Sequence, residues 1–240
     1  MLTILYYIFL VAMCFLFLGL SILMLMVTYP FQKSRRYVHE LSRVMVNTFF
    51  VVPPLWRRRV EGLENLDRSK SYVIVSNHQS MIDIPALYSV PLNFRWVSKR
   101  EVFKIPFFGR FLMVHGDICI NRAKASEAMG QLLSDGQLWL SRGASIAIFP
   151  EGTRSRDGNM LRFRSGAFML AKEAGVEVLP VVMSGTRSLI GRRALFNWRN
   201  EITIKILPPV SVEDLATRDM KEVVDQVRCD MMGALESMKR

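Results

Sequence analysis

A histidine and an aspartate five positions apart are the first residues whose types and spacing could do chemistry. His78 follows the apolar run Tyr72–Val75, and Asp83 comes just before Pro85. Proline is tolerated in the first turn of a helix, so we expect a helix to begin near Asp83 and its carboxylate to fold back onto the imidazole. A carboxylate behind a histidine fixes the tautomer and stabilises the imidazolium while the other ring nitrogen takes a proton. The pair is a candidate general base with its orienting acid.

Taken alone, this spacing does not establish a catalytic pair. Three histidines give a roughly one-in-six chance of some His-x4-Asp in a chain of ordinary composition. A surface histidine beside an aspartate that caps a helix is the competing interpretation. We assign the other two histidines, His39 and His115, to that ordinary surface class.

Two further loops could bind an anion. The segment from Phe149 to Ser155 follows a strand-like run and contains Glu151, Thr153 and Arg154, while Arg122 follows the run Asp117–Ile120. A guanidinium offers a planar fork of donors that suits a phosphate, and hydroxyl and backbone N–H groups add hydrogen bonds. The alternatives are a polar turn with an ion pair from Glu151 and, after the other run, a solvated turn.

Short apolar runs alternate with helical stretches from residue 60 onward, which predicts an α/β domain with a mostly parallel sheet. A helix over Ala125–Leu140 has apolar residues on one face, Gly166–Ala174 is stopped by Gly175, and Ser211 is the expected N-cap of a helical tail. The expected strands are Tyr72–Val75, Phe94–Val97, Asp117–Ile120, Ser145–Phe149, Val178–Met183 and Ile202–Leu207.

The first 32 residues contain no Asp, Glu, Lys, Arg or His. A helix over Leu2–Val27 would be about 39 Å long, enough to cross a hydrocarbon core of about 30 Å. The run is too long for a signal peptide, no basic residue precedes it and no small-residue cleavage site follows it. The Lys33-Ser34-Arg35-Arg36 segment after it indicates the cytoplasmic side of a membrane. A second helix over Tyr37–Val52 is amphipathic, and it either lies in the interface or packs on the soluble domain.

The amino-acid composition and the net charge exclude several classes of protein. Half of the 240 residues are apolar and 22% are charged, which excludes a disordered chain. Three cysteines at unrelated positions argue against a disulfide scaffold or a zinc site and favour a reducing compartment. The net charge of +11 predicts an anionic partner. Because much of the excess lies beside the apolar segment, a membrane surface is favoured over nucleic acid.

Taken together, three segments resemble a known family. Asn77–Asp83 (NHQSMID), Gly116–Arg122 (GDICINR) and Phe149–Ser155 (FPEGTRS) are similar, in order and spacing, to the first three blocks of the glycerolipid acyltransferases, and specifically of the bacterial 1-acyl-glycerol-3-phosphate acyltransferases. Val178–Gly185 resembles the fourth block, in which Pro180 would shape the acyl side of the site. The resemblance covers about residues 60–209.

The resemblance implies transfer of an acyl group from an acyl-thioester, on acyl carrier protein or coenzyme A, to the 2-hydroxyl of lysophosphatidic acid, giving phosphatidic acid for phospholipid biosynthesis. His78 would be the general base and Asp83 its orienting acid. No Ser or Cys nucleophile, metal or cofactor is required, since the thiolate leaves in a direct displacement. The residues implied in substrate binding are Glu151, Gly152, Thr153, Arg154, Arg122 and Lys99.

The family implies a twisted, mostly parallel sheet with helices on both faces, preceded by an N-terminal helical membrane motif. We therefore expect membrane-anchoring helices over residues 1–56 and the catalytic domain over 57–240, on the cytoplasmic face of the inner membrane. Alternatives are an acyltransferase acting on glycerol 3-phosphate or another lysolipid, a serine hydrolase and a lipid-binding module. No Gly-x-Ser-x-Gly occurs in the chain, which argues against the hydrolase, and retention of both His78 and Asp83 argues against a non-catalytic module.

Overall fold

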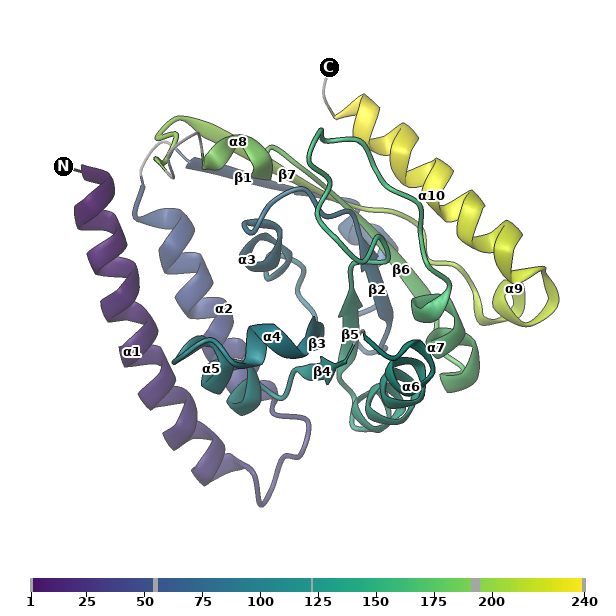
Figure 1. Cartoon of the computed structure of the whole chain (residues 1–240), viewed down its shortest axis with the longest axis horizontal. Coiled ribbons are helices and arrows are strands. Elements are labelled where there is room, and N and C mark those ends of the chain that lie inside the picture. The colour runs from purple at the N-terminus through teal and green to yellow at the C-terminus, as the bar shows by residue number, and fades with distance from the viewer. Residues whose placement is uncertain (1, 54–55, 122, 191–194, 239–240) are drawn as a thin grey trace.

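One seven-stranded sheet organises the molecule (Figure 1). The computed structural model describes residues 2–53, 56–121, 123–190 and 195–238. The strand order is β1-β7-β6-β2-β5-β3-β4, and only the β6–β7 pair is antiparallel. The strands are β1 (Trp56–Glu61), β2 (Val73–Ser76), β3 (Phe94–Lys99), β4 (Ile118–Ile120), β5 (Ser145–Ile148), β6 (Val178–Ser184) and β7 (Asn200–Ile206).

Helices cover both faces of this sheet. α1 and α2 run side by side at the edge of the molecule opposite α10 (Figure 1). The helices are α1 (Leu2–Thr28), α2 (Arg36–Val51), α3 (Asp83–Leu87), α4 (Arg100–Phe103), α5 (Phe108–His115), α6 (Ala125–Ser141), α7 (Gly166–Ala174), α8 (Thr186–Leu189), α9 (Val212–Thr217) and α10 (Met220–Ser237), with a 3₁₀ turn at Leu63–Asn65.

Alternate side chains of the central strands enter two separate cores. In β2, Val73 and Val75 pack with the helices α6, α7 and α10. Ile74 points to the other face, where Phe50 of α2 and Leu87 of α3 cover it. Strands buried on both faces are typical of parallel sheets, in which crossover helices cover each side. The predicted fold class is confirmed.

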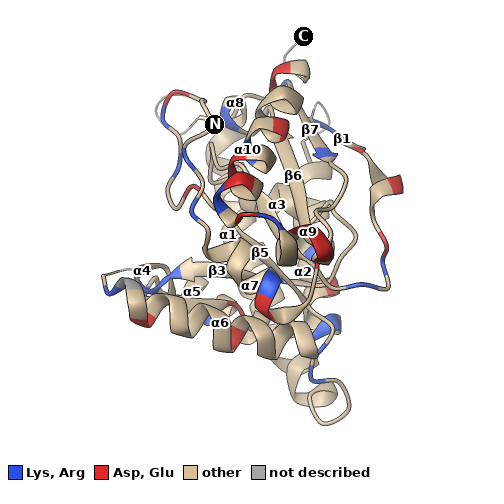
Figure 2. Cartoon of the chain, turned by 90° about the vertical axis from the view of Figure 1, so that its right-hand side faces the viewer, with Lys and Arg blue, Asp and Glu red and all other residues tan. Residues whose placement is uncertain are grey.

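The six strands expected from the sequence are all present, but some elements were not expected. β1 carries three arginines and pairs with β7 at the edge of the sheet. The helical tail predicted from Ser211 is divided, because Asp219 caps a new helix by accepting hydrogen bonds from the backbone N–H groups of Lys221 and Glu222. The short helices α4, α5 and α8 were also not expected. Figure 2 shows that α10 carries charged residues of both signs, whereas the charged residues of α9 are acidic.

α1 packs against residues 57–240 near its start and near its middle. Near its start, the Tyr6 ring packs edge-on against Phe196, with the ring centroids 5.1 Å apart. Near its middle, Phe15 contacts Phe107, with centroids 4.6 Å apart. In the loop after α1, Arg35 donates to the carbonyl oxygen of Met113 at 2.7 Å. The expected division between residues 56 and 57 stays a prediction, since the two parts pack closely.

The carboxyl ends of β2, β5, β3 and β4 meet at one edge, because these neighbouring strands are parallel. The loops after them carry the residues singled out from the sequence, which include His78 after β2, Lys99 at the end of β3 and Glu151 after β5. In open α/β sheets, ligands bind in the crevice outside this edge. The topology therefore gathers these residues from distant parts of the chain.

Candidate active site

His78 and Asp83 form a hydrogen-bonded pair at the end of β2. The His78 Nδ1 lies 2.8 Å from Asp83 Oδ2, and the Asp83 side chain is fully buried. The same carboxylate oxygen accepts the backbone N–H groups of Gln79 and Ser80, at 2.6 and 2.7 Å. An ionised carboxylate that orients an imidazole accepts its Nδ1–H, which leaves Nε2 as the basic nitrogen. Asp83 begins α3, and Pro85 lies in the first turn of this helix, as predicted.

The peptide of His78 is held by the loop that follows β5. Its N–H donates to Glu151 Oε1 at 2.7 Å, and its carbonyl oxygen accepts the N–H of Ser155 at 2.9 Å. The neighbouring Asn77 is buried and exchanges two hydrogen bonds with the backbone of Met183 in β6, at 2.8 and 2.9 Å. The position of His78 is therefore fixed from both neighbouring strands. The positioning role of Asn77 was not predicted from the sequence.

An aromatic ring stacks on the imidazole, and a second aromatic ring stacks on the first. The Phe149 ring stacks on His78 with centroids 3.9 Å apart and planes 7° from parallel. Trp96 of β3 stacks in turn on Phe149, at 4.9 Å and 27°. Such a stack restricts rotation of the imidazole about its side-chain bonds and excludes water from one face. No sequence pattern indicated this stack, because its members come from three different strands or the loops that follow them.

Glu151 is placed as a positioning group. It is 4% exposed, and its second oxygen accepts the N–H of Leu161 at 2.8 Å. Burial raises the pKa of Glu151 to about 7, against the lowering effect of the N–H donors from Leu161 and His78. One carboxylate oxygen thus holds the His78 peptide and the other holds the Leu161 peptide. A direct contact of Glu151 with substrate stays a prediction.

Five of the predicted site residues line one cavity of about 250 Å³. Exposed polar side chains of Lys99, Thr153 and Arg154 lie around it. Gly152 is also in the wall, with a backbone φ of +74° that glycine adopts without strain. His78 completes this set. Arg122, predicted to bind the phosphate, lies outside the described residues.

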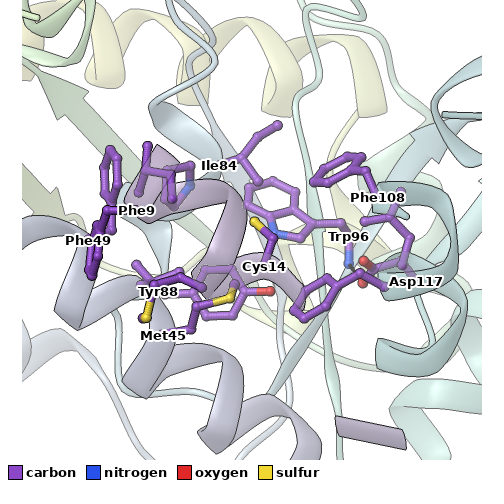
Figure 3. A pocket seen from close by; sticks show the side chains of 15 residues that line it. Phe9, Cys14, Met45, Phe49, Ile84, Tyr88, Trp96, Phe108 and Asp117 are labelled. Atoms are coloured by element: carbon purple, nitrogen blue, oxygen red, sulfur yellow. Dashed lines mark hydrogen bonds between the residues drawn. The ribbon is translucent and has the colours of Figure 1, made fainter. Parts of the chain in front are cut away.

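This cavity continues into apolar space beneath the N-terminal helices. Ile84, Trp96 and Phe108 line both the His78 cavity and a neighbouring cavity of about 240 Å³ (Figure 3). Figure 3 shows Phe9 and Cys14 of α1 and Met45 of α2 around the second cavity. A third cavity of about 330 Å³, between α1 and α5, shares five lining residues with it: Leu10, Cys14, Met45, Phe108 and Phe111. An apolar route thus leads from His78 to the exposed face of α1.

The assignment of His39 and His115 as ordinary surface histidines was wrong. Both are fully buried, with His39 Nδ1 3.0 Å from His115 Nε2 and His115 Nδ1 2.6 Å from Asp117 Oδ1. Because the carboxylate accepts from His115, the His39 N–H donates to the free His115 nitrogen. Burial is the main cause that lowers the pKa of each histidine. This network joins α2 to the end of α5.

Ser80, which lies between His78 and Asp83, is an N-terminal residue of the α3 turn. Its hydroxyl oxygen accepts the N–H of Ile82 at 3.2 Å. Among the described residues, no cluster of three or more His, Cys, Asp or Glu side chains is arranged for a metal ion. The expectation that the site needs no cofactor stays a prediction.

The chain is similar to proteins of known activity. A family model described as "Acyltransferase" matches residues 57–184, which is more than half of the chain. The chain belongs to the acyltransferase family. This membership confirms the resemblance seen in the sequence blocks.

Several curated members of the family are named 1-acyl-sn-glycerol-3-phosphate acyltransferases. The alpha enzyme of Mus musculus is 33% identical over 178 residues, which cover 73% of this chain and 62% of that protein. The chloroplastic enzyme LPAT1 of Arabidopsis thaliana is 35% identical over 169 residues, 69% of this chain and 47% of that protein. The chain therefore spans about half to two thirds of the curated relatives it matches.

A solved structure shares the whole fold. The crystal structure of the 1-acyl-sn-glycerophosphate (LPA) acyltransferase PlsC from Thermotoga maritima superposes with a TM-score of 0.79 and 24% sequence identity. The match covers 99% of this chain and 96% of that one, so it includes the two N-terminal helices.

Proposed function

We propose that this acyltransferase moves a fatty acyl group from a thioester to the sn-2 hydroxyl of 1-acyl-glycerol 3-phosphate, giving phosphatidic acid. The observation that carries the proposal is the His78–Asp83 pair, at 2.8 Å, in a cavity that has cationic side chains on its rim and opens into apolar space. Lysophosphatidic acid has a phosphate, a hydroxyl and an acyl chain, and the site offers a matching group for each. The names of the relatives support the same activity.

The proton path follows from the geometry. His78 Nε2 takes the proton of the acceptor hydroxyl while its oxygen attacks the thioester carbonyl. The new C–O ester bond forms and the C–S bond breaks, so the sulfur leaves as a thiolate and takes the proton from the imidazolium. Asp83 stabilises the imidazolium between these two transfers. We propose that no metal or cofactor takes part, because the thiolate is already a good leaving group.

The acceptor phosphate binds at the rim of the His78 cavity. Lys99 and Arg154 supply positive charge there, and the Thr153 hydroxyl can donate a hydrogen bond. Because both cations are exposed, they can reach a headgroup that remains at the membrane surface. The lining of the connected cavities beneath α1 and α2 is almost wholly apolar, which suits an acyl chain.

The molecule is membrane-associated, and we propose that α1 inserts into one leaflet rather than crossing the bilayer. Among the described residues, α1 is the one helix long and apolar enough to span a membrane. However, Tyr6 near its start contacts Phe196, and Arg35 in the loop after it contacts Met113, so both ends pack on the domain of residues 57–240. A helix with both ends on one domain cannot place those ends on opposite sides of a bilayer. Its exposed apolar side chains would then lie among lipid chains.

We place the enzyme on the cytoplasmic face of the inner membrane. Lys33, Arg36 and Arg57 are exposed near the membrane helices and can face anionic lipid. The other basic residues of this region are engaged in the protein. Arg58, for example, donates to Asn47 and Ser89. The three free cysteines fit a reducing compartment.

A purified-protein assay in detergent tests this function. The full chain is given lysophosphatidic acid, glycerol 3-phosphate or a lysolipid without a phosphate monoester, each with acyl-coenzyme A or acyl carrier protein thioester. We expect phosphatidic acid from the first acceptor, with at least about tenfold lower kcat/KM for the others, because they lack the chain or the full phosphate charge. Preference for glycerol 3-phosphate would contradict the proposed acceptor.

A further inference from the structure

A fourth cavity, of about 270 Å³, adjoins the His78 cavity and belongs to the other face of the sheet. Met129 and Leu132 of α6 and Gly166 of α7 form its sides. It shares Val97, Phe149 and Gly152 with the His78 cavity, so the two spaces meet at the loop after β5. A molecule in this fourth cavity can therefore bring its end to the catalytic histidine from the side opposite α1 and α2.

The lining of this cavity differs from that of the route beneath α1. Arg164 and Ser165 contribute polar side chains, while Ile120, Ile148 and Leu132 are apolar. The proposed reaction requires two substrates to meet at His78, and only one of them is a lipid. The donor thioester is carried on a phosphopantetheine arm, which is a flexible chain with two amides that ends in a phosphate. A cavity with mixed walls and a cation suits such an arm.

We propose that the cavity between α6 and α7 holds the phosphopantetheine arm of the acyl donor and that Arg164 binds its phosphate. The sulfur end of the arm then lies toward Phe149 and His78. This inference rests on the proposed acyltransferase function and assigns the donor and the acceptor phosphate to different sides of the β5 loop. Arg154 serves the acceptor, and Arg164 serves the donor.

The position of Arg164 supports this assignment. Its backbone N–H donates to the carbonyl oxygen of Pro150 at 2.9 Å, which ties it to the loop that also carries Glu151. Its guanidinium lies against Gly152, where a Cβ atom would be 3.1 Å from the guanidinium carbon. Within the described part of the chain, Arg164 forms no ion pair with a carboxylate. Its charge is thus available to an anion.

The surrounding loop is also positive. Residues 150–165 contain four arginines and two acids, and one of the acids, Glu151, is buried. The carboxylate of the other, Asp157, accepts hydrogen bonds from Ser155 and Asn159. An anionic carrier would be attracted to this surface whether it is the nucleotide of coenzyme A or an acidic carrier protein.

Filling the cavity provides the first test. Ala128, a half-buried residue of α6, lines it, and Ala128→Phe places a ring in the space of the arm. Gln131→Phe on the exposed side of the same helix is the matched control. We expect Ala128→Phe to raise the donor KM at least about tenfold while the acceptor KM and the melting temperature stay near wild type, because a filled subsite removes only the binding it provides. The control should leave both KM values unchanged.

The phosphate contact is tested by removing the charge or the phosphate. Arg164→Gln is compared with Arg162→Gln, another exposed arginine, which is not among the residues that line the cavity. Three donors are used: acyl-coenzyme A, the acyl carrier protein thioester and an S-acyl pantetheine without phosphate. We expect Arg164→Gln to raise KM about tenfold for the first two donors and to leave it unchanged for the third. The wild-type KM values show which carrier the enzyme uses.

Three results separate this inference from the proposed function. If Ala128→Phe raises the acceptor KM and not the donor KM, the cavity is not the donor site. If Arg164→Gln raises the KM for the S-acyl pantetheine as much as it raises the KM for the two donors that carry a phosphate, Arg164 does not bind the phosphate. If the wild type makes no phosphatidic acid with any donor, the proposed function fails, and calorimetric binding of coenzyme A then tests the cavity alone. Loss of that binding in Arg164→Gln supports the site, and equal binding overturns it. Should Ala128→Phe lower the melting temperature, Ala128→Val replaces it.

Discussion

At the scale of single residues, the His78 imidazole is held by groups from two stretches of chain. Asp83 accepts from its ring, Glu151 and Ser155 hold its peptide, and Phe149 stacks on its face. The Asp83 contact was predictable because it lies within one loop. The other contacts depend on the pairing of β2 with β5, more than 70 residues apart, so the sequence alone did not predict them. Such support keeps the base in its reactive orientation.

The proposed contact of Arg154 with the acceptor phosphate gives a prediction about substrate affinity. Arg154→Lys keeps the positive charge but loses the planar fork of donors, so it should not behave as a conservative change. We expect the acceptor KM to rise about tenfold, which corresponds to loss of one charge-assisted hydrogen bond of roughly 1.5–3 kcal/mol. Steady-state kinetics with varied acceptor and donor measure both constants. A rise in donor KM alone would place Arg154 against the thioester carrier.

Glu151 gives a prediction about pH and stability. Burial raises its pKa from 4.5 to about 7, so between these values the folded protein keeps a proton that the unfolded chain releases. The wild-type free energy of unfolding should therefore fall as the pH rises through this window, at up to about 1.4 kcal/mol per pH unit. Glu151→Gln has no proton to lose at this position and should lack this contribution.

Chemical denaturation of both proteins across this window measures the difference. At its acidic end, Glu151→Gln should be less stable by about 1–3 kcal/mol, because the amide nitrogen cannot accept the N–H of His78 or Leu161. Its kcat should fall as well, since the His78 peptide loses a contact. Equal pH slopes in the two proteins would show that Glu151 is ionised throughout this range.

At the scale of elements, long apolar or periodic segments were predicted well and short charged ones were not. No strand was predicted over the residues of β1, because Arg57, Arg58 and Arg59 follow one another and give no apolar run. This segment is nevertheless a strand, since an edge strand exposes alternate side chains and Arg58 folds over Phe50, with the guanidinium carbon 4.6 Å from the ring centroid. The break between α9 and α10 was missed because its only local signal is the capping Asp219.

The docking of α2 depends on buried histidines that were expected at the surface. His39 of α2 donates to His115, which donates to Asp117, and Arg95, Arg35 and Arg43 raise the positive potential around the pair. Because both histidine pKa values are lowered on folding, the unfolded chain binds more protons below pH 6.5. The stability from this network is present above that pH and is lost as the pH falls.

A substitution at His39 tests the contribution of this hydrogen-bonded network to stability. His39→Leu keeps a similar volume but leaves His115 Nε2 without its closest donor, so we expect a loss of about 1–3 kcal/mol in unfolding free energy above pH 6.5. The loss should shrink as the pH falls, and thermal or chemical unfolding over a pH series measures it. Glu40→Gln, a nearby change on the same helix that leaves the histidines in place, is the control. A loss that does not depend on pH would mean that His39 acts through packing alone.

At the scale of the whole molecule, we propose that α1 is both the membrane anchor and one wall of the apolar route from His78. The sequence identified its length and apolar character but left open whether it crosses the bilayer. The contacts of Tyr6 with Phe196 and of Arg35 with Met113 support our proposal that α1 stays in one leaflet, because both ends of α1 pack on residues 57–240. These contacts join residues far apart in the chain, and no local pattern indicates them.

The placement of α1 predicts the sidedness of both of its ends. A single cysteine introduced in place of Ile4 or Lys33, which are both exposed, in a variant with the three native cysteines changed to serine, should be labelled by a membrane-impermeant maleimide only from the face that carries the catalytic domain. Labelling in inverted and right-side-out vesicles makes the comparison. Labelling of the two positions from opposite faces would show that α1 spans the bilayer.

The claim that His78 is the base of an acyl transfer to lysophosphatidic acid is tested most directly by turnover of His78→Ala. Purified wild type and variant are compared in detergent at saturating donor, with phosphatidic acid as the measured product. We predict a fall in kcat of about 10² to 10⁴ with the acceptor KM within about twofold, because the base acts mainly in the transition state. Asp83→Asn should be similarly severe, since the amide can hold the wrong tautomer. Turnover of His78→Ala close to that of the wild type would contradict the account.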